Sequence, residues 1–322
     1  MGKRNSQIDM KRKGLRGRIA VVGTCSLDYV LNIDEFPSED HKYMCDLAKA
    51  RCGGVAANVA VNLALLGVPV DLVSWVGRGH MGRIISNHVK RQGVSIDGLT
   101  TSEEDTPQVF ILASRQSGTR TAFMTRHKCP ASLTEAQEEC ITNSSVVYYD
   151  GSWPDVSQSI LRLCRSTGTR VFVNYELPSP SGIEIFLSAH FAVASEQAVC
   201  EGKVANWTDL ESRLANIWQP NHHYIGVTLG KRGSLFFDGT CFLRTATPSV
   251  NELDTTGAGD AYQAGLLLAL LRGWDLQFSI RFAASLGALK CTYAGSDLSS
   301  AGKVDIQKEA LDLASMTTWD SV

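Results

Sequence analysis

The stretch DTTGAGDAYQAG, residues 254–265, places three small residues directly before an apolar helical segment. Gly257, Ala258 and Gly259 leave the backbone uncovered there, and the amides at the start of a helix bind phosphates and other anions. Asp260 falls in the first turn of the same helix, where the helix dipole favours an ionised carboxylate. That carboxylate could accept a proton from a substrate hydroxyl, or it could simply cap the helix. Both interpretations stay open on this stretch alone.

The composition indicates a globular protein that binds a small ligand. The 322 residues are 44% hydrophobic and 20% charged, which suffices for one large or two ordinary domains. A net charge of -2 and the absence of a Lys/Arg stripe with aromatic residues argue against a nucleic-acid partner. The nine cysteines are scattered without a C-x-x-C pair, which favours a reducing compartment over a disulfide framework or a zinc site.

The N-terminal residues carry no targeting signal that we accept. MGKRNS matches the M-G-x-x-x-S pattern of myristoylation, but we interpret residues 1–17 as a polar, disordered tail. The tail lacks the apolar region of a signal peptide, and no apolar stretch reaches transmembrane length. We therefore expect a cytoplasmic protein without a membrane partner.

The rest of the chain alternates between strand-like and helix-like segments. RIAVVGTC (18–25) is typical of a buried parallel strand, and AANVAVNLALLG (56–67) of a helix that stops at Gly67. Residues 28–52 and 106–125 break the alternation, and their pattern predicts antiparallel strands of a small β-lid. We expect an α/β sandwich with a central, mostly parallel sheet over residues 18–322.

Two signatures resemble the ribokinase, or PfkB, family of carbohydrate kinases. The first comprises Gly53, Gly54, Asn58, Ala60, Gly67 and Gly77, and the second comprises Asp254, Thr255, Gly257, Ala258, Gly259, Asp260 and Gly265. The resemblance runs from about residue 18 to residue 300, and VNELDTTGAGD and FAASLGALKCT look closest to the ketohexokinase and sulfofructose kinase branch. It implies a ribokinase-like three-layer sandwich with a lid.

The resemblance also implies an ATP-dependent phosphorylation of a sugar hydroxyl. Asp260 would be the general base, and the amides from Thr256 to Gly259 would form the anion hole. Thr228, Gly230 and Gly233 match the element that contacts nucleotide phosphates, and the P-loop pattern is absent. The residues expected to bind the sugar are Asp28, Gly53, Gly54 and Asn58, with Lys42 and Gln108 of the lid as further candidates that could instead be solvated.

Two departures from the family pattern affect the cofactors. SEQA (195–198) stands where an N-x-x-E element usually organises the Mg²⁺ water shell, so Glu176 or Glu196 would have to compensate. GRGHMG (77–82) has Gly79 where an Asp is usual, which gives it the look of a dinucleotide motif. We reject a nicotinamide site because the following segment SIDGLTTSEEDTPQ is typical of a polar loop. A requirement for K⁺ stays open.

Three further interpretations stay open. The acceptor could be a nucleoside, for which Tyr29, Phe36, Tyr43 and Phe123 offer aromatic rings in the lid. The missing Glu allows a catalytically weak sugar-binding or regulatory protein. Some relatives pair their lids, so a homodimer through the lid is a further expectation.

Overall fold

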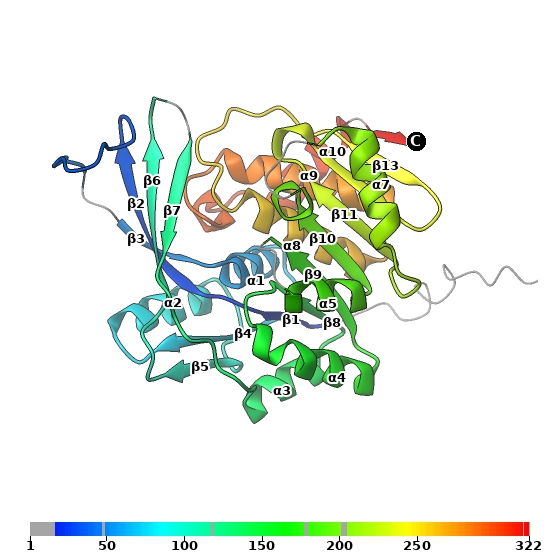
Figure 1. Ribbon diagram of the computed structural model, residues 1–322, viewed down its shortest axis with the longest axis horizontal. Coiled ribbons are helices and arrows are strands. Elements are labelled where there is room, and N and C mark those ends of the chain that lie inside the picture. Colours follow the sequence, from blue (N-terminus) through cyan, green and yellow to red (C-terminus); the bar gives the residue numbers. More distant parts are fainter. Residues whose placement is uncertain are drawn as a thin grey trace, which may run out of the picture.

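A ten-stranded sheet forms the centre of the molecule, with the strand order β14-β13-β12-β11-β10-β9-β8-β1-β4-β5 (Figure 1). The computed structural model describes residues 17–46, 49–116, 119–176, 180–200, 205–317 and 319–321. The predicted disordered tail therefore lies almost entirely outside the described residues. The strands of the sheet are β1 (Ile19–Val22), β4 (Val70–Gly77), β5 (Leu99–Ser102), β8 (Val146–Tyr149), β9 (Arg170–Tyr175), β10 (Phe191–Ser195), β11 (Tyr224–Thr228), β12 (Ser234–Phe237), β13 (Phe242–Thr245) and β14 (Trp319–Ser321).

The sheet is parallel from β5 to β11 and antiparallel from β12 to β14. The sheet is buried on both faces. Successive side chains of a strand point to opposite sides, and here both sides carry apolar residues. In β1, Ile19 and Val21 join one apolar core, while Ala20 and Val22 join the other. This arrangement confirms the expected α/β sandwich.

The helices cover the two faces of the sheet. Those that pack into the core with Ile19 are α1 (Val55–Leu65), α2 (His80–Arg91), α8 (Ala258–Arg272), α9 (Leu276–Cys291) and α10 (Ile306–Ser315). Those of the other core are α3 (Glu135–Thr142), α4 (Ser157–Thr167), α5 (Pro180–Ser188), the short α6 (Glu196–Val199) and α7 (Trp207–Ile217). Over the described ranges, none of these helices is long and apolar enough to cross a membrane.

A second sheet of four strands stands to one side of the core (Figure 1). Its order is β3 (Lys49–Gly53), β2 (Ser26–Ile33), β6 (Gln108–Ser114) and β7 (Arg120–Met124). The outer pairs are antiparallel as predicted, but the central pair β2–β6 is parallel, so the prediction of antiparallel strands was wrong for that pair. The reason is that β2 follows β1 and β6 follows β5. β1 and β5 are parallel, so their carboxyl ends lie on the same side of the molecule, and β2 and β6 start out in the same direction.

The segment after α2 also differs from the prediction of a polar loop. Leu99–Ser102 forms β5, which pairs in parallel with β4 at the sheet edge. The strand is short, half-buried and rich in threonine, so its apolar pattern is weak. Gly82, which precedes β5 in the chain, has a packing role, because a Cβ there would lie 2.0 Å from the carbonyl oxygen of Gly77; a Cβ on Gly79 would meet nothing within 4 Å.

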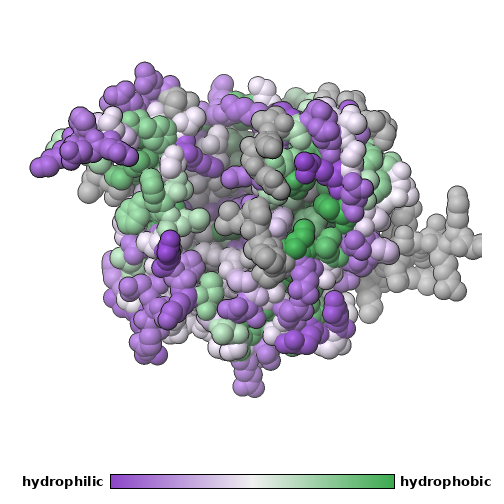
Figure 2. Space-filling view, in the orientation of Figure 1, coloured by the Kyte–Doolittle hydropathy of each residue, from purple (hydrophilic) through white to green (hydrophobic). Residues whose placement is uncertain are grey.

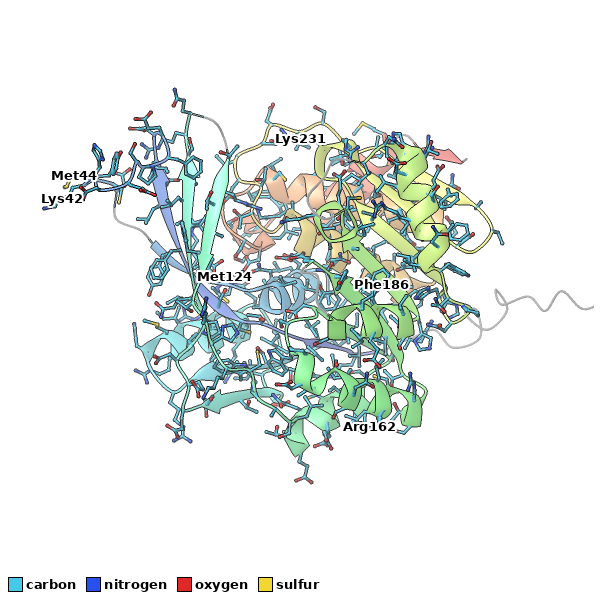
Figure 3. The ribbon with its side chains drawn as sticks, viewed as in Figure 1. Lys42, Met44, Met124, Arg162, Phe186 and Lys231 are labelled. Carbon is cyan, nitrogen blue, oxygen red and sulfur yellow. The ribbon has the colours of Figure 1, made fainter. Side chains whose placement is uncertain are left out.

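The nine cysteines are all free, and Cys45 is the exposed one. It lies in the hairpin between β2 and β3, next to Met44 at the outer tip of the lid (Figure 3). Burial raises the pKa of the Cys25 thiol to about 12 and that of Cys140 to about 11.

Candidate active site

The start of α8 is the centre of the candidate site. Gly257 precedes the helix with φ +76°, and a Cβ there would lie 1.8 Å from the carbonyl oxygen of Ser296, so only glycine fits this turn. No side chain caps the helix. The Asp260 carboxylate points elsewhere and accepts a hydrogen bond from Asn58 Nδ2 at 2.7 Å. The interpretation of Asp260 as a helix cap was therefore wrong.

Two cavities meet at this helix start. The Asp260 cavity has a volume of about 280 Å³ and contains the side chains of Asp28, Asn58, Gln108, Asp150, Glu176 and Asp260. The Gly-loop cavity has a volume of about 400 Å³ and is lined by Arg120, Thr228, Gly230, Lys231, Gly233, Ala258 and Gly259, with apolar residues beyond them. Consecutive residues of α8 thus face two different spaces.

Asp260 is 7% exposed, and its surroundings disfavour the ionised form. Burial raises the pKa of Asp260 well above its ordinary value, and the charge of Glu176 raises it further. The hydrogen bond from Asn58 acts in the opposite direction. A buried carboxylate with a raised pKa is a stronger base than an exposed one, as proton abstraction from a hydroxyl requires.

Asp28 and Asp150 line the same cavity, Asp28 from within β2 and Asp150 from directly after β8. Burial raises the pKa of Asp28, whose Oδ1 accepts a hydrogen bond from Ser26 Oγ at 2.6 Å. Gly53 makes room for that carboxylate, since a Cβ on Gly53 would lie 2.0 Å from Asp28 Oδ2. Gly53 therefore supports the cavity, while Gly54 lines it.

Sequence reasoning missed Asp150. It follows β8 directly, and its carboxylate accepts hydrogen bonds from the amides of Thr24 at 2.7 Å and Ser152 at 2.9 Å. Burial raises the pKa of Asp150 to about 6 despite these bonds. The signal was available: the chain reads VVYYD, an Asp at the end of a buried parallel strand, where ligands bind in open α/β sheets.

The two glutamates proposed for Mg²⁺ lie in different surroundings. Glu176 lines the Asp260 cavity, and its Oε1 accepts a hydrogen bond from Asn174 Nδ2 at 3.0 Å. Glu196 instead pairs with Arg232 and accepts the amide of Ala205 at 3.0 Å. Ser195 caps the short helix α6 through the amide of Ala198.

Mg²⁺ needs few protein ligands, because nucleotide oxygens and water complete its shell. Within the described part of the chain, no group of three His, Cys, Asp or Glu could hold a metal by itself. The position of Glu176 fits one carboxylate contact to the ion or its water shell, and that of Glu196 does not.

Basic residues border the Gly-loop cavity. Arg120 of β7 donates a hydrogen bond from Nη1 to Thr256 Oγ1 at 2.7 Å, which ties the lid to the turn before α8. Sequence reasoning missed Arg120 because its place depends on how the lid strands pair.

The amide of Thr256 donates to Asp254 Oδ1 at 3.0 Å. Its place in the anion hole stays a prediction, and that donor is already used in the structure.

The two lid residues predicted to contact substrate lie far apart. Gln108 begins β6 and lines the Asp260 cavity. Lys42 is exposed at the outer tip of the lid, whereas Met124, which lines the cavity, lies near the base of the lid (Figure 3). Lys42 is in the long connection between β2 and β3, which extends away from the core, so the structure does not bring it to the site.

Comparison with known proteins agrees with this geometry. The chain matches the description "pfkB family carbohydrate kinase" over residues 16–301. It is 25% identical to a nucleoside kinase of Methanothermobacter thermautotrophicus over 84% of this chain and 88% of that protein. It is 24% identical to the ketohexokinase of Mus musculus over 87% of this chain and 98% of that protein.

Among solved structures, it resembles the ribokinase of Arabidopsis thaliana complexed with ribose and ATP. The TM-score is 0.80 at 20% identity, over 92% of this chain and 98% of that one. The protein belongs to the PfkB family of carbohydrate kinases. It is an ATP-dependent phosphotransferase with an alcohol group as acceptor. The similar identities to a nucleoside kinase and a ketohexokinase do not distinguish the predicted ketohexokinase branch.

Proposed function

We propose that this kinase transfers the γ-phosphoryl group of ATP to a hydroxyl of a ketose or related sugar bound in the Asp260 cavity. The observation that carries the proposal is the shared wall at the start of α8. Asp260 lines one cavity, while Ala258 and Gly259 line the other. Phosphoryl transfer depends mainly on positioning and on charge stabilisation, and this wall supplies a base on one side and helix-terminal amides on the other.

The Asp260 cavity suits a neutral polyol. Carboxylates accept hydrogen bonds from two hydroxyls each, and Asp28 and Asp150 both line the cavity with Gln108 and Asn58. In the proposed step, Asp260 accepts the proton of the attacking sugar hydroxyl. The oxygen of that hydroxyl bonds to the γ-phosphorus of ATP, and the bond between the γ-phosphorus and the bridging oxygen breaks and releases ADP. The amides of Gly259 and Asp260 have no earlier turn of helix to bond to, so they are free to stabilise the developing charge.

The Gly-loop cavity suits the nucleotide. Gly230 and Gly233 allow close approach of phosphates, and Lys231 and Arg120 supply positive charge. Pro248, Val250 and other apolar residues at the same cavity suit the flat face of the adenine base. Mg²⁺, held by phosphate oxygens and water near Glu176, would neutralise charge on the transferring group.

The lid completes the proposal. Arg120 connects the lid to the turn before α8 and lines the Gly-loop cavity, so the lid supplies a cation for the phosphates, and its closure over a sugar would exclude water. A homodimer through the lid stays a prediction. Exposed Phe110 and Phe123, which are paired on β6 and β7, give this sheet an apolar surface (Figure 2), and sedimentation velocity would test whether two copies associate.

Two observations favour a sugar over a nucleoside. The Asp260 cavity is lined by Asp28, Asn58, Gln108 and Asp150, whose side chains match the hydroxyls of a polyol. None of the predicted lid aromatics lines it, and Tyr29 stacks on Phe110 at 5.1 Å instead. A catalytically weak binding protein would have no need for a buried carboxylate of raised pKa beside a glycine turn.

The test is ADP release across ketohexoses, sulfofructose, ribose and nucleosides at saturating ATP and Mg²⁺. We expect turnover with a ketose or a related sugar. Turnover above the hydrolysis background with nucleosides alone would refute the sugar assignment. A lack of turnover with every acceptor, in protein that binds an ATP analogue, would favour the binding-protein alternative.

A further inference from the structure

Lys290 is a fully buried lysine near the end of α9. Its side chain is 0% exposed. Among the lysines and arginines whose burial the structure describes, Lys290 is the one that is buried. An ammonium group removed from water is strongly destabilised unless polar partners replace its hydration. Such a residue inside a core helix therefore has a specific set of partners that keep it there.

The partners of the ammonium are backbone carbonyl oxygens. Lys290 Nζ donates to the carbonyl of Asp254 at 2.9 Å and to that of Tyr293 at 3.2 Å. Burial lowers the pKa of Lys290, and the charges of Asp254 and Asp297 oppose that shift. The ammonium thus lies between the turn before α8 and the turn after α9, where two backbone carbonyl oxygens would favour any cation.

These contacts fix the turn that leads into α8. The amides of Leu253 and Asp254 both donate to the carbonyl of Cys291, at 2.7 and 3.1 Å. The Asp254 carboxylate then accepts the amides of Thr256 at 3.0 Å and Gly295 at 2.9 Å. Lys290 donates to the backbone carbonyl of Asp254, the polar group of that residue that the other bonds leave unpaired. The ammonium of Lys290 therefore helps to fix the position of Gly257 and of the start of α8.

We propose that the Lys290 ammonium is a built-in monovalent cation that holds the Asp254–Gly257 turn in its active form, so that this kinase needs no added K⁺. K⁺ and an ammonium carry the same charge, and both bind backbone carbonyl oxygens. Here the ammonium of Lys290 already binds the carbonyl oxygens of Asp254 and Tyr293. It therefore leaves no room for a separate ion at the same two oxygens. Lys290 is a positioning residue, and the inference rests on the proposed function because it takes this turn as part of the phosphate site.

The first test measures kcat of the wild-type enzyme in K⁺, Na⁺ and choline chloride at equal ionic strength. We expect equal rates in the three salts. A several-fold activation by K⁺ would overturn the inference.

The second test removes the charge with Lys290→Ala, which leaves room for a cation, and uses exposed Lys303→Ala as the matched control. We expect kcat of Lys290→Ala to fall by about 10²-fold in choline chloride, since small misplacements of catalytic groups cost that much. K⁺, NH₄⁺ or propylammonium should restore activity to this variant alone. Full activity in choline chloride, or a loss that no cation restores, would contradict the inference.

Thermal unfolding and calorimetric binding of a non-hydrolysable ATP analogue accompany both tests. If Lys290→Ala does not fold, the wild-type salt series decides. If no acceptor supports ADP release, the proposed function fails, but the inference still predicts analogue binding that is independent of K⁺ in the wild type and dependent on K⁺ in Lys290→Ala.

Discussion

The Asp260 cavity and the Gly-loop cavity lie on either side of one helix start, yet their linings have opposite character. The Asp260 cavity collects the carboxyl groups of Asp28, Asp150, Glu176 and Asp260. The Gly-loop cavity is lined by glycines and by Arg120 and Lys231, with Glu252 as its acidic residue. Since anions are repelled from the first and attracted to the second, the difference predicts which partner binds where: a neutral polyol with the carboxylates, and a polyphosphate with the glycines and cations.

The sharpest way to break this comparison is Asp260→Asn, which keeps the shape of the Asp260 cavity and removes its base. We expect kcat to fall by about 10²–10⁴-fold, the usual contribution of a general base. The affinity for an ATP analogue should stay nearly unchanged, because the Gly-loop cavity is intact. Steady-state kinetics and calorimetry on one preparation measure both quantities.

The stability of the same variant provides the control. A carboxyl group with a pKa raised on folding stabilises the protein at acidic pH, and that contribution is lost as the pH rises from the ordinary carboxyl pKa through the raised one. At neutral pH, Asp260→Asn should therefore unfold at the same or a higher temperature than the wild type. A folded variant that keeps more than about a tenth of the wild-type kcat would contradict the role of Asp260 as base.

Arg120→Met tests the opposite side of the comparison. The substitution keeps a long side chain on β7 but removes the charge beside Thr256, so we expect kcat to fall by about 10²–10³-fold. Binding of the sugar should change little, because Arg120 does not line the Asp260 cavity. Exposed Arg162→Met, on α4, is the matched control (Figure 3), and an equal loss of activity in both variants would count against a local role.

The smallest effect is expected from Glu176→Gln. The Glu176 charge raises the pKa of Asp260, so its removal should lower that pKa and move the acidic limb of the kcat profile to lower pH. The concentration of Mg²⁺ that gives half-maximal rate should rise. Glu196→Gln, outside both cavities, should change neither quantity, and a pH profile that is identical in wild type and Glu176→Gln would disprove the coupling.

The sequence predicted those parts of the site that depend on local geometry. The glycine turn and Asp260 are consecutive residues, and a helix start has the same chemistry wherever it lies. Arg120 and Lys290 could not be found this way, because one depends on strand pairing in the lid and the other on the packing of α9 against a distant turn. Lys290 stands in GALKC, where the surrounding apolar residues indicate only a buried helix.

Errors in the fold have the same origin. β5 has only four residues at a sheet edge, so its pattern is too short to distinguish from a loop. The parallel pairing of β2 with β6 follows from where two distant strands leave the core sheet, and no alternation within either segment encodes it. The alternation of buried strands and helices, by contrast, repeats along most of the chain, which explains why the overall architecture was predicted correctly.

The exposure of Cys45 at the tip of the lid has a practical consequence for following the lid in solution. Maleimides react with thiolates, and burial keeps thiols such as Cys25 and Cys140 protonated and shielded. A fluorophore added at neutral pH should therefore attach first to Cys45, without any substitution in the chain. The native protein thus carries its own labelling position on the segment whose movement would accompany each catalytic cycle.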